Sequence, residues 1–131
     1  MATIFSKIAA GEIPSHKVAE NEEFYAFLDI NPIAEGHTLV IPKKEVDYLF
    51  DIDDAALGRM MAFAKIVARA LEKAVPCKRI GLTVIGLEVP HAHIHLVPIR
   101  KESDIFFGNP KLKKTPEELA RTAAEIRAEW A

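Results

Sequence analysis

The sequence predicts an α+β fold, in which an antiparallel sheet of about five strands carries a long central helix, a short N-terminal helix and a C-terminal helix. Apolar residues recur at helical spacing over one long central stretch. Short β-prone runs lie on both sides of that stretch. We expect the 131 residues to form a single domain over 1–131, with its core over 1–100 and a C-terminal loop and helix over 101–131.

The N-terminal third predicts a short helix followed by three strands. Apolar residues in 4–8 share one helical face, and a glycine follows where the helix can end. The runs 16–20 and 23–28 are predicted strands on either side of a tight turn. The run 37–41 is strongly β-prone and is followed by a proline.

The remaining elements are predicted by the same criteria. The apolar positions of 57–71 form the face of a long helix. Strands are expected at 80–85 and 91–99, and a loop at 100–114. The last helix begins at Thr115, where an acid three residues later completes a capping box.

Composition excludes several classes of protein. The 17 Lys and Arg nearly balance the 19 Asp and Glu, so we expect neither nucleic acid nor a membrane surface as a partner. Cys77 is the only cysteine and forms no internal disulfide. The N-terminus reaches a charge too early for a signal peptide, and no apolar run approaches the roughly 20 residues of a membrane span. We therefore expect a cytoplasmic protein.

Three histidines, His91, His93 and His95, alternate with apolar residues. Because side chains alternate across a strand, the three imidazoles share one face while the apolar residues point toward a core. Imidazole is costly to bury without a partner, so this pattern points to a functional site.

Metal binding is one interpretation of the histidine row. Imidazole suits zinc, and His-x-His can supply two ligands. His91 and His95 would lie roughly 13 Å apart along a straight strand, which is too far for three histidines to share one ion. His37 could supply the third ligand, so zinc is possible but not expected.

Phosphoryl or nucleotidyl transfer is the other interpretation. The central His93 can attack phosphorus and form a covalent intermediate. Its neighbours can donate hydrogen bonds to phosphate oxygens or assist the leaving group. Histidine suits these roles because it titrates near neutral pH.

The sequence resembles the histidine-triad (HIT) superfamily, in its Hint-like branch. The residues 91–97 match the signature His-φ-His-φ-His-φ-φ, in which φ is an apolar residue. The segments 4–14, 24–29 and 36–44 also resemble conserved parts of that family. The resemblance therefore covers most of positions 4–99.

The resemblance implies a nucleotide hydrolase or transferase that cleaves a nucleoside phosphoramidate or a related nucleotide. His93 matches the nucleophile that becomes a nucleotidyl-histidine. His95 matches the residue that contacts the phosphate and assists the leaving group, and His91 helps to orient the centre. His37 matches the fourth histidine of the site, and Asp29 matches the acid that holds the ribose hydroxyls.

The resemblance also implies a base pocket, a ligand and an assembly. Phe5, Ile8, Phe27 and Ile30 match the apolar pocket for the base, although Phe5 and Ile8 could equally be ordinary core. The expected ligand is a purine nucleotide or nucleotide conjugate, with no cofactor required. The family forms homodimers through an extended sheet, and we expect the same of this chain.

One departure from the family pattern precedes the triad. The family usually has Gly-Gln-Ser/Thr-Val there, whereas this chain has Leu87 and Glu88 in place of the amide and the hydroxyl. A carboxylate beside a bound phosphate repels it unless it is protonated or turned away. Glu88 therefore predicts an altered leaving-group side, and a nucleotide-binding or interaction module with weak or no catalysis is the alternative function.

The C-terminal region is less diagnostic. In the family it can reach the partner subunit's site, so 104–110 and Trp130 are candidates for shaping specificity. The basic run 111–114 is expected to be solvated surface.

Overall fold

The computed structural model describes residues 3–130 and has the α+β architecture that the sequence predicts. Five strands form one antiparallel sheet in the order β1-β2-β3-β5-β4. They are β1 (Lys17–Glu20), β2 (Phe24–Leu28), β3 (Thr38–Pro42), β4 (Arg79–Thr83) and β5 (Ile94–Ile99). The helices are α1 (Ile4–Ala9), α2 (Asp54–Ala74) and α3 (Pro116–Ala128), with short 3₁₀ turns η1 (Leu49–Asp51) and η2 (Glu102–Ile105).

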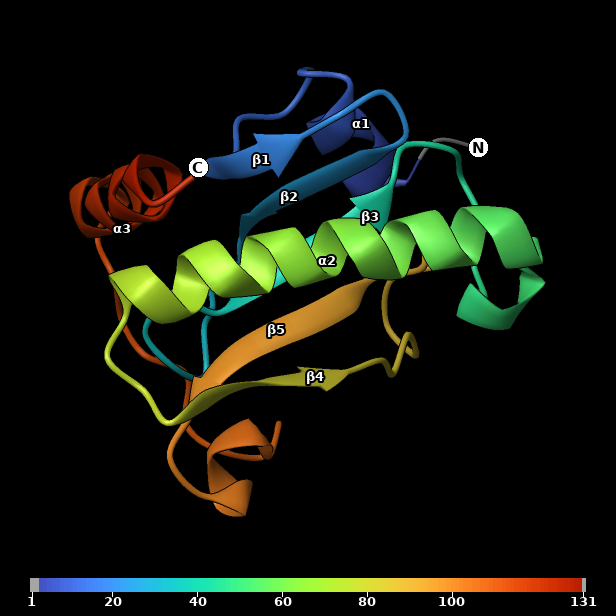
Figure 1. Ribbon diagram of the computed structural model, residues 1–131. Coiled ribbons are helices and arrows are strands. Elements are labelled where there is room, and N and C mark those ends of the chain that lie inside the picture. Colours follow the sequence, from blue (N-terminus) through green and yellow to red (C-terminus); the bar gives the residue numbers. More distant parts are fainter. Residues whose placement is uncertain (1–2, 131) are drawn as a thin grey trace.

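Helix α2 crosses one face of the sheet along its whole length (Figure 1). Its N-cap is Asp53, whose carboxylate accepts a hydrogen bond from the Ala56 N–H. Its apolar face is buried against the sheet through Met60, Phe63, Ala64, Val67, Ala70 and Leu71. This layer forms the larger of two apolar clusters.

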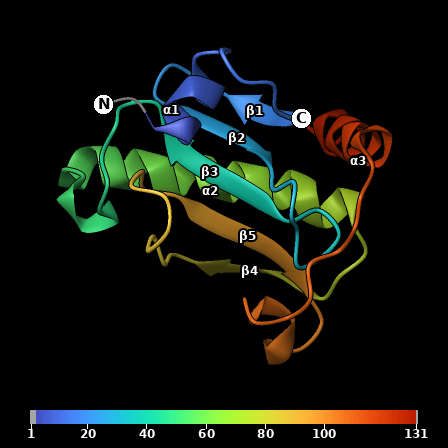
Figure 2. The same ribbon diagram turned by 180° about the vertical axis from the view of Figure 1, so that it is seen from behind.

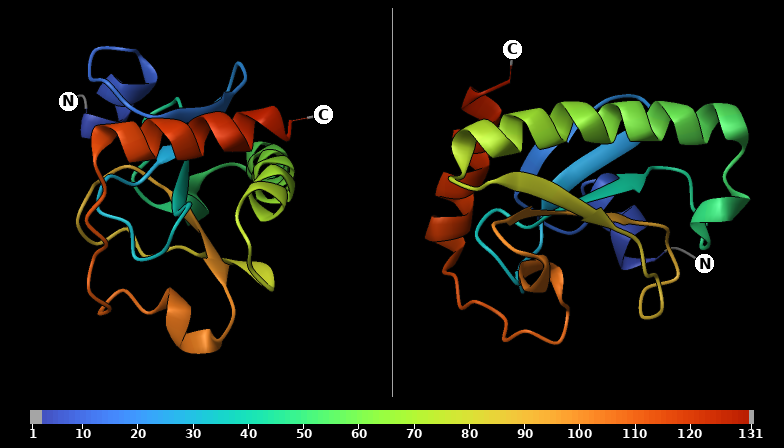
Figure 3. Two further views of the ribbon diagram at one scale, coloured as in Figure 1. Left: turned by 90° about the vertical axis from the view of Figure 1, so that its left-hand side faces the viewer. Right: turned by 60° about the horizontal axis from the view of Figure 1, so that its bottom comes forward.

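Helix α3 completes the same cluster from the side of β1 and α2 (Figure 3). It begins with the predicted capping box, in which Thr115 and Glu118 exchange hydrogen bonds. Leu119, Ala123 and Ile126 are buried in the core. The C-terminal helix is therefore packed into the structure rather than appended to it.

The opposite face of the sheet, which faces the viewer in Figure 2, carries a smaller apolar cluster. Phe5 and Ile8 of α1 pack there against residues of β2 and β3. Helix α1 covers this face only in part, and the remaining surface is where the histidines lie.

The last two strands are shorter than predicted. Strand β5 begins at Ile94, not at position 91, because the N–H groups of His91 and Ala92 bond to the carbonyls of Val89 and Val46 instead of a sheet neighbour. Strand β4 ends at Thr83, and the chain then turns at Gly86, whose φ is +75°. His91 and His93 therefore lie in a loop that leads into β5.

No helix within residues 3–130 is long and apolar enough to cross a membrane.

Candidate active site

The three triad rings lie on the side of the sheet that α1 partly covers. The His91 and His93 rings lie 6.0 and 5.0 Å from the Phe5 ring, and the His95 ring lies 4.8 Å from that of His93. The intervening Ala92 and Ile94 are buried in the cluster on the opposite face. The one-faced array therefore forms even though only His95 belongs to a regular strand.

His93 has its proton position fixed by a main-chain atom. Its Nδ1 lies 2.7 Å from the carbonyl oxygen of His91. A carbonyl only accepts hydrogen bonds, so Nδ1 carries the proton and donates it. The other ring nitrogen, Nε2, then keeps a free lone pair, which is what a nucleophile requires.

His91 is buried and bonded at both ring nitrogens. Its Nε2 donates to the carbonyl of Pro42 at 2.7 Å, so its Nδ1 accepts from the Thr3 hydroxyl, also at 2.7 Å. Burial lowers the pKa of His91, although the bond to Pro42 opposes that shift. The His91 ring is therefore neutral and is held in a fixed position next to His93.

Thr3 is itself held by a carboxylate. The Thr3 N–H and the Ser6 hydroxyl donate to the same oxygen of Glu45, at 2.6 and 2.8 Å. We call Thr3, Ser6, Glu45 and His91 the N-terminal clip. Nothing in the sequence marked Thr3 or Glu45, because the clip joins residues 42 and 88 positions apart in the chain.

His37 and His95 form a second hydrogen-bonded chain. The Ile33 N–H donates to Nδ1 of His37 at 3.2 Å, so His37 carries its proton on Nε2. That Nε2 lies 2.9 Å from Nδ1 of His95 and donates to it. His95 therefore keeps its proton on Nε2, the nitrogen that remains available as a donor to a substrate.

Both histidines of this hydrogen-bonded pair, His37 and His95, are neutral at physiological pH. Burial lowers the pKa of His37 to about 4; Asp29 opposes this shift, and the charge of Lys111 acts in the same direction as burial. Burial lowers the pKa of His95 to about 3, with further contributions from His93, His37 and Lys111. His95 thus offers a neutral N–H rather than an imidazolium.

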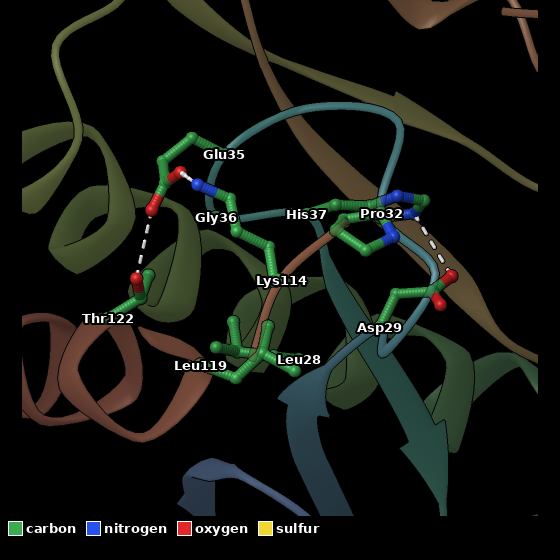
Figure 4. A pocket seen from close by; sticks show the side chains of 9 residues that line it. All are labelled: Leu28, Asp29, Pro32, Glu35, Gly36, His37, Lys114, Leu119 and Thr122. Atoms are coloured by element: carbon green, nitrogen blue, oxygen red, sulfur yellow. Dashed lines mark hydrogen bonds and ion pairs between the residues drawn. The ribbon is translucent and has the colours of Figure 1, made fainter. Parts of the chain in front are cut away.

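Asp29 lies beside His37 (Figure 4). Its Oδ2 is 3.7 Å from Nε2 of His37, and its Oδ1 accepts from the Asn31 N–H at 2.8 Å. Behind His37 is a narrow cavity of about 10 Å³, room for about one water molecule. A nucleotide cannot enter it.

A glycine sets the position of His37. Gly36 has a φ of +84°, and a Cβ there would come within 2.9 Å of the side chains of Leu71 and Val75. The chain therefore passes close to α2 immediately before His37, which aligns β3 with the site.

The predicted base-pocket residues are only partly brought together. Phe5, Ile8 and Phe27 belong to one apolar cluster, and the rings of Phe5 and Phe27 lie 5.6 Å apart. Ile30 lies outside that cluster, with 64% of its surface exposed. The apolar surface next to His93 is thus formed by α1 and β2.

Glu88 lies in the loop before the triad, and its side chain is exposed. Within residues 3–130 it forms neither a hydrogen bond nor an ion pair. Its side chain is turned to solvent, and Glu88 is not among the groups that shift the pKa of His37, His91 or His95.

The alternative from the sequence is a zinc site of two triad histidines with His37, but the one candidate group within residues 3–130 contains a single triad histidine. Asp29, His37 and His95 each offer one ligand atom, and these atoms lie within 4.8 Å of one another. Carboxylate and imidazole are suitable zinc ligands. However, Nε2 of His37 and Nδ1 of His95 already share a hydrogen bond of 2.9 Å, so an ion bound between these two nitrogens would have to break that bond.

Comparisons with known proteins identify the family of this chain. The HIT domain family model matches residues 10–102. The chain belongs to the HIT family. The family prediction from the triad motif is therefore confirmed.

Two curated HIT relatives span most of this chain. Adenosine 5′-monophosphoramidase HNT1 of Saccharomyces cerevisiae is 40% identical over 129 residues, which cover 97% of this chain and 82% of the yeast protein. Adenylylsulfatase HINT3 of Arabidopsis thaliana is 30% identical over 128 residues, which cover 94% of this chain and 64% of the plant protein.

A solved structure shows the same HIT fold. The HIT-like protein of Bartonella henselae superposes with a TM-score of 0.83 at 33% identity, covering 97% of this chain and 95% of that one. The predicted α+β fold is therefore confirmed as well.

Proposed function

We propose that this HIT protein hydrolyses a nucleoside phosphoramidate or a related nucleotide through a nucleotidyl-histidine on His93. The observation that carries the proposal is the bond from Nδ1 of His93 to the His91 carbonyl, which leaves Nε2 free to attack phosphorus. The activities named for the yeast and plant relatives support a hydrolase that acts on phosphorus-containing bonds.

The first half of the reaction transfers the nucleotidyl group to the protein. The Nε2 lone pair of His93 forms the N–P bond while the bond from phosphorus to the leaving group breaks, with its electron pair going to the leaving group. An amine, protonated on nitrogen by solvent beforehand, leaves neutral. The Nε2–H of His95 donates a hydrogen bond to the charge that develops on the phosphoryl or leaving-group oxygen.

The second half regenerates the histidine. Water attacks phosphorus, the P–Nε2 bond returns its electron pair to His93, and the water loses one proton to solvent. Throughout, the positive charge on the His93 ring is stabilised by the His91 carbonyl, because that carbonyl accepts from Nδ1. The product is a nucleoside monophosphate.

Residues around the histidines are assigned to the rest of the nucleotide. We propose that Phe5, Ile8 and Phe27 contact a purine base, with Ile30 at the rim, and that Asp29 accepts from the ribose hydroxyls. No cofactor enters this scheme, and the hydrogen-bonded His37–His95 pair acts as a donor chain rather than as a zinc site.

The assembly is also a proposal. Strand β4 is an edge strand of the sheet, with Leu82 exposed on it. An open edge is a template for pairing with another chain, and a second copy at this edge would extend the sheet into a homodimer. Sedimentation velocity distinguishes this dimer from a monomer.

The decisive experiment follows AMP release from adenosine 5′-phosphoramidate. We expect turnover by the wild-type protein and a loss of about 10³-fold or more in His93→Ala, because the nucleophile is absent. The matched control is His16→Ala, a histidine outside the site. Mass spectrometry of the quenched reaction should detect the nucleotidyl adduct on His93. Full activity in His93→Ala contradicts the proposal.

The same preparations test the alternative functions. Tight binding of AMP or GMP by calorimetry, without turnover of any nucleotide conjugate, identifies an interaction module. Stoichiometric zinc in protein purified without a histidine tag, together with loss of activity on chelation, identifies a metal-dependent site.

A further inference from the structure

The loop between η2 and α3 returns to the histidine site of its own subunit. It passes beside the loop that joins β2 and β3 (Figure 2), where the Leu112 N–H donates to the carbonyl of Pro32 at 2.8 Å. That neighbouring loop also carries Ile33, which fixes the proton of His37. The two loops are therefore joined at the end of the site where His37 and His95 lie.

Internal hydrogen bonds hold this returning loop in shape. Oδ2 of Asp104 accepts from the N–H groups of Arg100 and Lys101 at 2.9 and 3.0 Å. The amide of Asn109 donates to the carbonyl of Ser103 at 2.7 Å. Both ends of the segment 104–109 are thus hydrogen-bonded to residues in 100–103, which holds the start of the loop in place.

These hydrogen bonds place the aromatic ring of Phe107 against the rings of His37 and His95. The ring centroid of Phe107 lies 4.6 Å from that of His95 and 5.9 Å from that of His37. Its neighbour Phe106 is 64% exposed. Phe107 therefore covers the donor chain that assists the leaving group, whereas Phe106 faces solvent.

A lysine lies over the ring of Phe107. Nζ of Lys111 is 5.7 Å from the Phe107 ring centroid and donates to the Phe107 carbonyl at 3.3 Å. No carboxylate within residues 3–130 lies within 4 Å of Nζ of Lys111, whereas the nearby Lys114 is paired with Glu35. Lys111 is thus held in place without an acidic partner.

The site needs the positive charge that Lys111 offers. His37 and His95 are neutral, so they donate hydrogen bonds to an anion but do not balance its charge. Lys111 lies close enough to disfavour the charged forms of both histidines, and the same field attracts an anion at that position.

We propose that Phe107 and Lys111 form a leaving-group subsite within the same subunit, and that Lys111 favours an anionic leaving group, phosphate or sulfate, over a neutral amine. This inference rests on the proposed function, because it assigns the leaving-group end of that same site. Phe107 keeps water from His95, and Lys111 balances the charge that the leaving group carries away.

The test compares two substrates that differ in the charge of the leaving group. We measure kcat/KM for adenylyl sulfate and for adenosine 5′-phosphoramidate in the wild type and in Lys111→Gln. We expect a loss of about fivefold or more for adenylyl sulfate, the size of one partly solvated charge pair, and a change within about twofold for the phosphoramidate. Lys111→Arg should restore the preference for adenylyl sulfate, and high salt should weaken that preference in the wild type.

Matched controls separate the effect of the Lys111 charge from the effect of the Phe107 loop on the histidines. Lys113→Gln removes an exposed lysine of the same loop and should change neither substrate. Phe107→Ala should lower kcat for both substrates, because it opens His95 to water, whereas Phe106→Ala should not.

The possible outcomes distinguish the inference from the function beneath it. An equal loss on both substrates in Lys111→Gln assigns the lysine to the shared α-phosphate and overturns the subsite. If the wild-type protein cleaves neither substrate, the proposed function fails. In that case, calorimetry with AMP and α,β-methylene-ADP tests the subsite by itself. The assignment stands only if Lys111→Gln weakens the binding of α,β-methylene-ADP more than the binding of AMP.

Discussion

The two ends of the histidine site are held in different ways. At one end, main-chain carbonyls of Pro42 and His91 set the protons of His91 and His93. At the other end, His95 depends on His37, and both are covered by Phe107 from the C-terminal loop. Carbonyl acceptors are present whatever the side chains are, whereas the loop depends on its particular sequence.

Under the proposed function, this difference separates the chemical step from the selectivity for the leaving group. A nucleophile that takes its orientation from backbone atoms keeps its lone pair through most sequence changes nearby. A leaving-group end built from a loop can change its charge and shape without disturbing that nucleophile. The exposed Glu88 fits this division, because it lies in the loop before the triad yet forms no hydrogen bond or ion pair with the described histidines.

The largest expected effect tests the donor at the loop-covered end. We expect His95→Ala to lower kcat for the phosphoramidate by about 100-fold, because the Nε2–H donor is lost while the nucleophile remains. Single-turnover kinetics measures the step directly. A loss as complete as that of His93→Ala would show that the two ends do not work separately, and His16→Ala again serves as the control.

A smaller effect tests the backbone-held end through the N-terminal clip. Thr3→Val removes the hydroxyl that donates to Nδ1 of His91, and we expect kcat to fall by about tenfold as the His91 ring loses its fixed position. Nitrogen-15 NMR of the histidine side chains should show a shifted Nδ1 signal for His91 as its hydrogen bond is lost, while Nε2 stays protonated against the Pro42 carbonyl.

Thr3→Ser is the control for the clip, because it keeps both the hydroxyl and the N-cap of α1 and should restore kcat. Thr3→Val also weakens that cap, so a merely structural role would lower the melting temperature and leave kcat unchanged.

The smallest effect concerns stability against pH. Because the pKa of His37 falls from 6.5 to about 4 on folding, the unfolded chain binds a proton first as the solution is acidified. The contribution of the neutral His37 to the free energy of unfolding is therefore complete above about pH 6.5 and is lost as the pH falls toward 4. The wild type should lose about 1 kcal/mol more than His37→Gln between pH 7.5 and 5.5. Urea unfolding measures both, and parallel curves would contradict the burial of a neutral His37.

Much of the fold could be predicted from local patterns. The apolar period of α2 and the capping box of α3 describe interactions within one helix, so they are visible in the sequence. The strand at 91–99 was predicted too long, because alternation places side chains on one face but does not show which N–H groups find a sheet partner. The bonds of His91 and Ala92 to other loops made that difference.

The sequence by itself determined that three imidazoles share one face and that the chain is a HIT protein. It also identified His37 and Asp29 as neighbours of that face through the family resemblance. Only the tertiary structure decided which nitrogen of each ring carries the proton. The Pro42 carbonyl, the His91 carbonyl and the Ile33 N–H make those assignments, and the Thr3 hydroxyl then donates to the unprotonated nitrogen of His91. Thr3 and Pro42 lie far from their histidines in sequence, and Ile33 is brought to His37 by a loop, so the path of the folded backbone sets these bonds.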